Sequence, residues 1–173
     1  MDQPQGTALD KQPLADLSRQ FDFNTGFLTQ LTQDWSDEDW NHHADGMTNT
    51  GHWIVGHLAH TRRWMLRLLY QITEEEPWEA HFTIGAPPDG PCEDVPVDML
   101  INAFREAGKT LGEALSTTAP EKAQSPLPAP LTDGFPDGGK TIESGARFLF
   151  FHEAYHLGQI GLLRRCAGKT GLS

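Results

Sequence analysis

The chain has little cysteine, little positive charge and no long hydrophobic run. Its two cysteines among 173 residues are too few for a disulfide framework, so we expect a reduced, cytoplasmic protein. No stretch of about twenty apolar residues could form a transmembrane helix. Residues 1–12 are polar and lack the apolar segment of a signal peptide. These absences argue against a secreted disulfide scaffold and against an integral membrane protein.

Basic residues are scarce as well. Thirteen Lys and Arg residues stand against 24 Asp and Glu residues, which leaves a net charge of −11 at pH 7. Such a charge repels phosphate backbones and anionic lipids, so neither nucleic acid nor a membrane is an expected partner. Adjacent basic residues occur at Arg62-Arg63 and Arg164-Arg165. We interpret both pairs as charges on helix surfaces.

The chain does contain enough apolar material for a packed core. Hydrophobic residues make up 38% of it, with five Trp and nine Phe, which is too much for a disordered chain. Its length suits one domain over residues 1–173. The runs with β-like alternation are too short to build a sheet.

Helical periodicity is found in four segments of about twenty residues, separated by polar or Pro- and Gly-rich connections. The segments run from about Pro13 to Asp34, from Asn49 or Thr50 to Thr73, from Pro96 to Thr117, and from Thr141 to Ala167. We therefore predict an all-α protein with a four-helix bundle. The long connection between the second and third helices allows a crossover.

Two histidines near the C-terminus are spaced for metal binding. His152 and His156 are four residues apart, so on a helix they lie on the same face and can bind one divalent transition metal. With Glu153 the segment reads H-E-x-x-H, as in zinc peptidases whose Glu is the general base. The extended form of that motif needs Gly and His where this chain has Gln159 and Leu162, and no acidic residue follows Glu153. A third ligand must therefore come from upstream.

Residues 50–64 offer three histidines at the start of a strongly helical stretch. At roughly 100° per residue, His57 shares a face with the apolar and aromatic side chains of this helix. His60 lies about 60° to one side of it, and His52 points well away. His57 is therefore the best candidate for the third ligand, with His60 in reserve. The alternative is that these histidines only pack in the core.

Several side chains beside the histidine pair have more than one interpretation. Glu153 lies about 100° round the helix from His152, so it is either a group that supports a ligand or a charge on the helix surface. Gln159 lies nearer the ligand face, where it either orients a ligand or lies at the edge of a pocket. Tyr155 either supplies a hydroxyl to the pocket or packs, and we favour packing. Gly158 is expected to permit close helix packing.

The Gly56-His57-Leu58-Ala59 step and the segment from His152 to Ile160 together resemble the DinB/YfiT-like superfamily. The likeness includes Trp35-Ser36-Asp37-Glu38-Asp39 before the second helix and extends over the whole chain in helix order and length. Members of that family are four-helix bundles whose second and third helices run parallel through a crossover. They hold a divalent metal by one histidine of the second helix and two of the fourth. For this chain the resemblance implies the metal ligands His57, His152 and His156.

The resemblance also implies a chemistry, because some relatives are transferases or isomerases that use small bacterial thiols such as bacillithiol or mycothiol. Three imidazoles leave a coordination position open, so the metal could activate a water, polarise a carbonyl or bind a thiol as thiolate. Zinc or nickel is the expected metal, with manganese or iron as alternatives.

Three functions remain open from the sequence. The first is a metal-dependent enzyme, either a small-thiol-dependent S-transferase or a hydrolase, acting on a small-molecule substrate. The second is a metal- or ligand-binding bundle with a stress-related role and no turnover. The third is a helical interaction protein whose histidines only pack. We expect the first, assign no catalytic residue, and note that such a bundle could form a homodimer.

Overall fold

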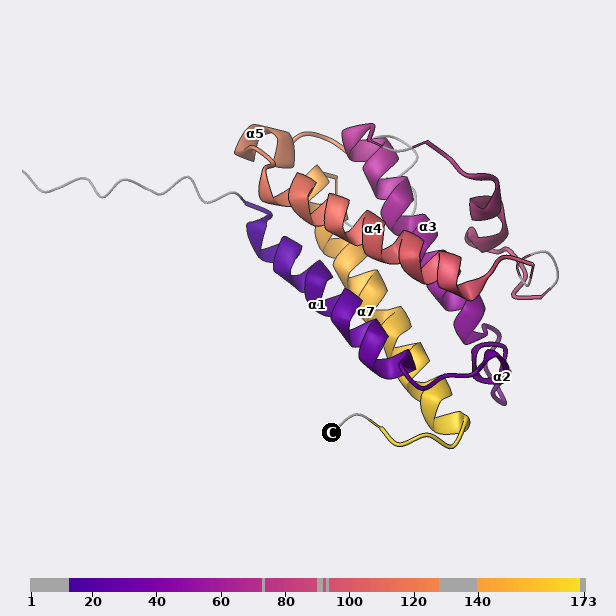
Figure 1. Ribbon diagram of the computed structural model, residues 1–173. Helices are drawn as coiled ribbons and strands as arrows, with labels where there is room; N and C mark the ends of the chain where they lie inside the picture. Colours follow the sequence, from indigo (N-terminus) through magenta and orange to yellow (C-terminus); the bar gives the residue numbers. More distant parts are fainter. Residues whose placement is uncertain (1–12, 73, 90–91, 93, 128–139, 172–173) are drawn as a thin grey trace, which may run out of the picture.

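The computed structural model describes residues 13–72, 74–89, 92, 94–127 and 140–171. Within them four long helices pack as an all-α bundle (Figure 1). They are α1 (Ala15–Thr32), α3 (Gly51–Met65), α4 (Val97–Ser116) and α7 (Ile142–Cys166). The described part of the chain contains no β-strand and has only an isolated bridge between residues 126 and 141. The predicted fold class is confirmed.

The second and third long helices, α3 and α4, run parallel. Near the start of both, His52 of α3 donates a hydrogen bond at 2.7 Å to the carbonyl of Val95, just before α4. Near the end of both, the hydroxyl groups of Tyr70 and Thr118 lie 2.8 Å apart. The segment that joins the two helices must therefore return along the bundle, as Figure 1 shows. The expected crossover is confirmed.

The first and fourth long helices, α1 and α7, also run parallel to each other. Asn24 of α1 contacts Glu153 of α7, and farther along both helices Asp34 pairs with Arg164. Helix α7 packs against both α1 and α3, while α4 packs against the other side of each. The helices that contain the histidine motifs, α3 and α7, are therefore neighbours.

Four short elements lie at the ends of the long helices or between them. They are α2 (Asp37–Trp40), the π-helical turn η1 (Leu66–Tyr70), the 3-10 helix η2 (Pro77–Phe82) and α5 (Pro120–Ala123). Turn η1 continues α3, whereas the other three occupy segments that we expected to be loops. In the segments of η2 and α5 the prolines exclude a long helix, but a proline at the first position can begin a short one, as it does in both.

A buried ion pair lies in the bundle core and joins α3 to α7. Arg62 and Glu153 have no exposed side-chain surface, and Arg62 donates from Nε to Oε1 at 2.6 Å and from Nη2 to Oε2 at 2.8 Å. Asn24 of α1 donates to Glu153 at 3.0 Å, and the Phe104 carbonyl of α4 accepts from Arg62 at 3.0 Å. A Cβ at Gly108 would lie 2.0 Å from Arg62 Nη1, so glycine makes room for the guanidinium. All four long helices therefore contact one charge pair.

The surface interpretation of the adjacent basic residues was wrong for one member of each pair. Arg62 is in the core, and Arg164 is 4% exposed because it pairs with Asp34 and donates to the Leu31 carbonyl. A long arginine can be buried where a carboxylate and carbonyl groups satisfy its donors.

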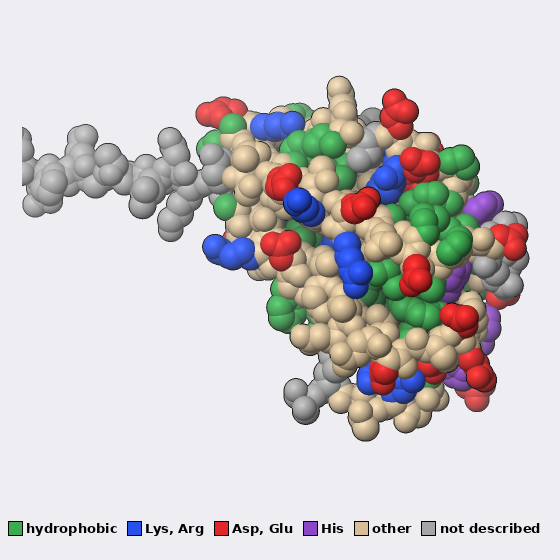
Figure 2. All heavy atoms as spheres, in the orientation of Figure 1, with side chains coloured by type: hydrophobic (Ala, Val, Ile, Leu, Met, Phe, Trp, Pro, Cys, Tyr) green, Lys and Arg blue, Asp and Glu red, His purple; other side chains and the backbone are tan. Residues whose placement is uncertain are grey.

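Charged side chains of both signs are interspersed on the outer surface that Figure 2 shows, where Lys and Arg lie among Asp and Glu. None of the described helices is both long enough and apolar enough to cross a membrane.

Candidate metal centre

Three histidines from two helices meet beside the core. His57 of α3 and His152 and His156 of α7 each offer one ring nitrogen, and these nitrogens lie within 4.8 Å of one another. The ring centroids of His57 are 5.1 Å from His152 and 5.0 Å from His156, and the two α7 rings are 4.5 Å apart. The structure thus brings together the three residues that the resemblance implied, in a cluster that could hold a metal ion.

The backbone of the crossover orients His57. Its Nδ1 donates to the carbonyl of Phe82, the last residue of η2, at 2.7 Å, which leaves the Nε2 lone pair for the cluster. Phe82 can approach α3 because residue 56 is glycine: a Cβ at Gly56 would lie 2.2 Å from the Phe82 ring. The Trp53 indole stacks on the His57 ring with centroids 4.8 Å apart. A hydrogen bond and a stacking contact therefore restrain this imidazole.

The two histidines of α7 differ in the hydrogen bonds that orient their rings. His156 Nδ1 donates to Gln159 Oε1 at 2.7 Å, so its Nε2 is the nitrogen with the free lone pair. His152 Nε2 lies 3.1 Å from His57 Nε2, while His152 Nδ1 is buried with no hydrogen-bond partner in the described structure. In a tetrahedral site with metal–nitrogen distances of about 2.0–2.1 Å, neighbouring nitrogens lie about 3.3 Å apart. The donor set and its spacing therefore fit a divalent metal.

Burial keeps the three imidazoles neutral. Loss of solvation lowers the pKa of His57 from 6.5 to about 4 and that of His152 to about 3, and it lowers the pKa of His156 as well. Positive charge on neighbouring histidines would lower the first two further. Since a metal binds the unprotonated nitrogen, the cluster is ready to bind metal at neutral pH without first losing protons.

Glu153 does not belong to this cluster. Its carboxylate is fully buried and accepts from Arg62 and Asn24, so the interpretation as a helix-surface charge was wrong, and no contact joins it to a histidine ring. Both oxygens are already engaged in the core. The geometry therefore does not support a zinc-peptidase role in which this residue would be the general base.

Gln159 and Tyr155 of α7 differ in how they contact the cluster. Gln159 contacts the cluster through its bond to His156, as one of the two interpretations had it. Tyr155 is 58% exposed, its ring packs edge-on against that of His156 with centroids 5.2 Å apart, and its hydroxyl accepts from Gln159 Nε2 at 3.3 Å.

The remaining histidines of α3 lie outside the cluster. His52 is buried and donates to the Val95 carbonyl. His60, the reserve ligand, instead donates from Nδ1 to Glu79 Oε2 at 3.1 Å. The structure therefore places in the cluster the histidine of α3 that the angular argument favoured, and Glu79 is a partner that this argument missed.

A cavity of about 540 Å³ opens beside the cluster between α3 and the crossover. His57 and His60 line it, together with Trp64, Arg67 and Ile84 among others. A smaller apolar hollow of about 70 Å³ shares Trp64 and Ile84 with it and extends to His152, Phe148 and Leu149 of α7. The two hollows thus adjoin at Trp64 and Ile84, and polar side chains such as His60 and Arg67 line only the larger one, which suits a small amphipathic molecule.

Sequence reasoning missed the part of the crossover that forms one wall of this space. Glu79 and Phe82 belong to η2, within a segment that we read as a loop because of its prolines. The one available signal was Glu76-Pro77-Trp78-Glu79, in which a proline follows a capping position and an acidic residue comes three positions after that cap.

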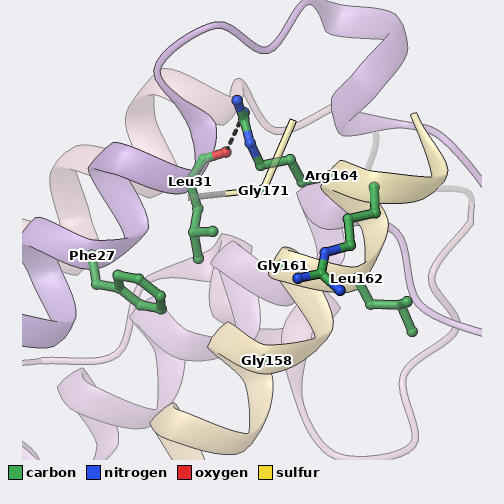
Figure 3. A pocket seen from close by; sticks show the side chains of 8 residues that line it. Phe27, Leu31, Gly158, Gly161, Leu162, Arg164 and Gly171 are labelled. Atoms are coloured by element: carbon green, nitrogen blue, oxygen red, sulfur yellow. Dashed lines mark hydrogen bonds between the residues drawn. The ribbon is translucent and has the colours of Figure 1, made fainter. Parts of the chain in front are cut away.

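A separate hollow of about 300 Å³ lies between the C-terminal parts of α1 and α7 (Figure 3). Phe27 and Leu31 line it from α1, and Gly158 and Gly161 from α7, while no histidine of the cluster does. The expectation that Gly158 permits close packing was wrong, because a Cβ there would meet no atom within 4 Å.

The comparison with protein families agrees with this geometry. The model of the DinB superfamily matches residues 20–160, which include all three clustered histidines. No curated protein matches the chain significantly.

Proposed function

We propose that this chain, which belongs to the DinB superfamily, binds one divalent transition metal through His57, His152 and His156 and transfers a small thiol to an electrophilic substrate. The convergence of three neutral imidazoles, two of them buried and that of His152 partly buried, is the observation that supports it. Such a metal would supply Lewis acidity that favours the thiolate form of a bound thiol.

The three imidazole ligands narrow the choice of metal. Imidazole nitrogens favour zinc, nickel, copper and iron over magnesium or calcium, which take oxygen ligands. Three neutral histidines with no carboxylate in the cluster suit zinc or nickel, with manganese or iron as alternatives. A three-residue set also leaves a coordination position for an exogenous ligand, unlike a closed structural site.

The space beside the cluster supports the choice of reaction. Trp64, Phe148 and Leu149 offer an apolar wall that would hold the hydrocarbon part of an electrophile and exclude water from it. Exclusion of water favours attack by a thiolate over hydrolysis. Peptide hydrolysis of the H-E-x-x-H kind is disfavoured because Glu153 pairs with Arg62 in the core.

Metal analysis tests the first half of the proposal. Elemental analysis of the protein purified without added metal, or reconstituted with zinc or nickel, should find about one metal per chain, and His57→Ala and His152→Ala should lose it while keeping their helical circular dichroism. His43→Ala, which changes a histidine outside the cluster, is the matched control and should keep the metal. Equal metal content in all four proteins would refute the triad.

Turnover tests the second half. The metal-loaded protein should catalyse conjugation of 2-mercaptoethanol or a cysteine-derived thiol to an aromatic electrophile, and His57→Ala should abolish it. A protein that holds one metal but accelerates neither conjugation nor ester hydrolysis would instead be a binding module without turnover.

A further inference from the structure

His60 is the histidine of α3 that is next to the metal cluster but does not belong to it. It follows His57 by three residues and lines the same cavity of about 540 Å³. Its Nδ1 is engaged with Glu79, and its side chain keeps 12% of its surface exposed. Within the described structure no hydrogen bond uses its Nε2. A neutral imidazole that donates from Nδ1 has a lone pair on Nε2, which here belongs to a side chain of the cavity wall.

The partner of His60 is a permanently charged carboxylate. Glu79 has no exposed side-chain surface, and it accepts from Arg63 Nε at 2.8 Å and from Arg67 Nη2 at 2.7 Å as well as from His60. Burial alone would raise the pKa of Glu79, but these hydrogen bonds and one from the Glu76 backbone outweigh it and hold that pKa well below its usual range. The carboxylate thus stays ionised through the neutral range.

Negative charges outnumber positive charges by one among the groups near the His60 imidazole. Arg63 and Arg67 are the two cations in contact with the carboxylate. Three acidic groups lie near them: Glu79 itself, Glu76 at 3.7 Å from Arg63, and Glu75, which lines the same cavity as Arg67. His57, the other titratable group on this side of α3, is kept neutral by its burial. An imidazolium at position 60 would therefore balance the local charge.

We infer that His60 is the proton acceptor of this pocket, oriented by Glu79, for a small thiol that enters the cavity beside His57. The S–H bond breaks and an Nε2–H bond forms, so that a thiolate and an imidazolium are left, with the imidazolium hydrogen-bonded to the Glu79 carboxylate. A histidine oriented by a carboxylate at its other ring nitrogen is a common arrangement for general bases. This assignment rests on the proposed thiol-transfer function and adds the residue that receives the proton.

The test counts protons when a thiol binds, so it needs no turnover. Binding of 2-mercaptoethanol to the zinc-loaded full chain would be measured by calorimetry at pH 7.5 in two buffers that differ in ionisation enthalpy. If His60 accepts the thiol proton, the wild-type protein should release almost none to the buffer, while His60→Gln should release about one per thiol bound. His43→Gln, which changes an exposed histidine outside the cavity, should behave as the wild type.

Each outcome decides one of the two proposals. Zinc content is measured first, and its absence from the wild-type protein would refute the proposed function. With zinc bound, release of about one proton by the wild type, or equal release by the wild type and His60→Gln, would overturn the role of His60 alone. Absence of thiol binding to the zinc-loaded chain would overturn it too, because no thiol proton would then reach the pocket. The number of protons that the wild-type protein releases per thiol bound tests the role of His60 even if His60→Gln fails to fold.

Discussion

Replacing Glu153 by Gln should destabilise the fold without removing the metal site. The change keeps the shape of the side chain but leaves Arg62 as an uncompensated charge with no exposed surface. It also places an amide NH₂ where one oxygen now accepts from Arg62 Nη2 at 2.8 Å or from Nε at 2.6 Å. Breaking a buried ion pair on one side costs about 3–5 kcal/mol. The free energy of unfolding should fall by that amount, which is a large part of the stability of a domain this size.

Urea unfolding followed by circular dichroism at 222 nm measures the effect. With an m-value of about 2 kcal/mol/M, the midpoint should fall by about 1.5–2.5 M. Glu143→Gln is the matched control, since it makes the same change on the same helix in a partly exposed pair with Arg147, and it should cost no more than about 1 kcal/mol. Metal content of Glu153→Gln below its unfolding midpoint should equal that of the wild type.

A double replacement separates pairing from packing. Arg62→Met combined with Glu153→Leu removes both charges together, and an apolar pair of similar volume is often neutral or stabilising in place of a buried ion pair. The double variant should therefore be more stable than Glu153→Gln. The reasoning is refuted if Glu153→Gln changes stability by less than about 1 kcal/mol, or if it loses the metal while keeping the fold.

Three further outcomes follow from the cluster and its supports. Gly56→Ala should displace Phe82, whose ring would lie 2.2 Å from the new Cβ, and so weaken metal binding; equal zinc affinity in a competition titration with a chelator would contradict this. Gln159→Leu removes the acceptor that orients the third imidazole and should lower zinc affinity by about 10–100-fold in the same titration, with a similar melting temperature. Because the folded-state pKa values of His57 and His152 are about 4 and about 3 against 6.5, the folded metal-free protein binds fewer protons than the unfolded chain between these values. Its stability should therefore be full above pH 6.5 and fall with pH toward 4, at up to about 1.4 kcal/mol per pH unit for each histidine, and an unfolding midpoint that is constant over this range would contradict the shifts.

The four long helices could be predicted from the sequence because their signals are local. Apolar spacing and caps depend on residues a few positions apart, and Thr50 and Thr141, near which two of the predicted helices begin, cap α3 and α7. The pairing of His152 with His156 is local in the same sense. Which histidine of α3 joins them depends on helix orientation, and the angular argument favoured His57, the one that the structure places beside them.

Long-range pairing is what the sequence left open. A charged residue next to a histidine could lie on the surface or in the core, and the partner that decides this for Glu153 is Arg62, which is 91 positions away. The same holds for Glu79, whose role depends on three partners from α3 and η1. No periodic pattern marks such partners, so the ion pairs and the crossover wall of the site became visible only in three dimensions.

The crossover also determines which residues of the site change together when the sequence changes. The six-residue 3-10 helix η2 supplies the Phe82 carbonyl that orients His57 and the Glu79 carboxylate that orients His60, although η2 is not one of the bundle's four long helices. Substitutions in η2 would therefore change the basicity and direction of two imidazoles while the Arg62–Glu153 core kept the helices in register. In an evolving protein, substitutions in this one connection could thus alter both imidazoles together while the sequence of the four long helices stayed the same.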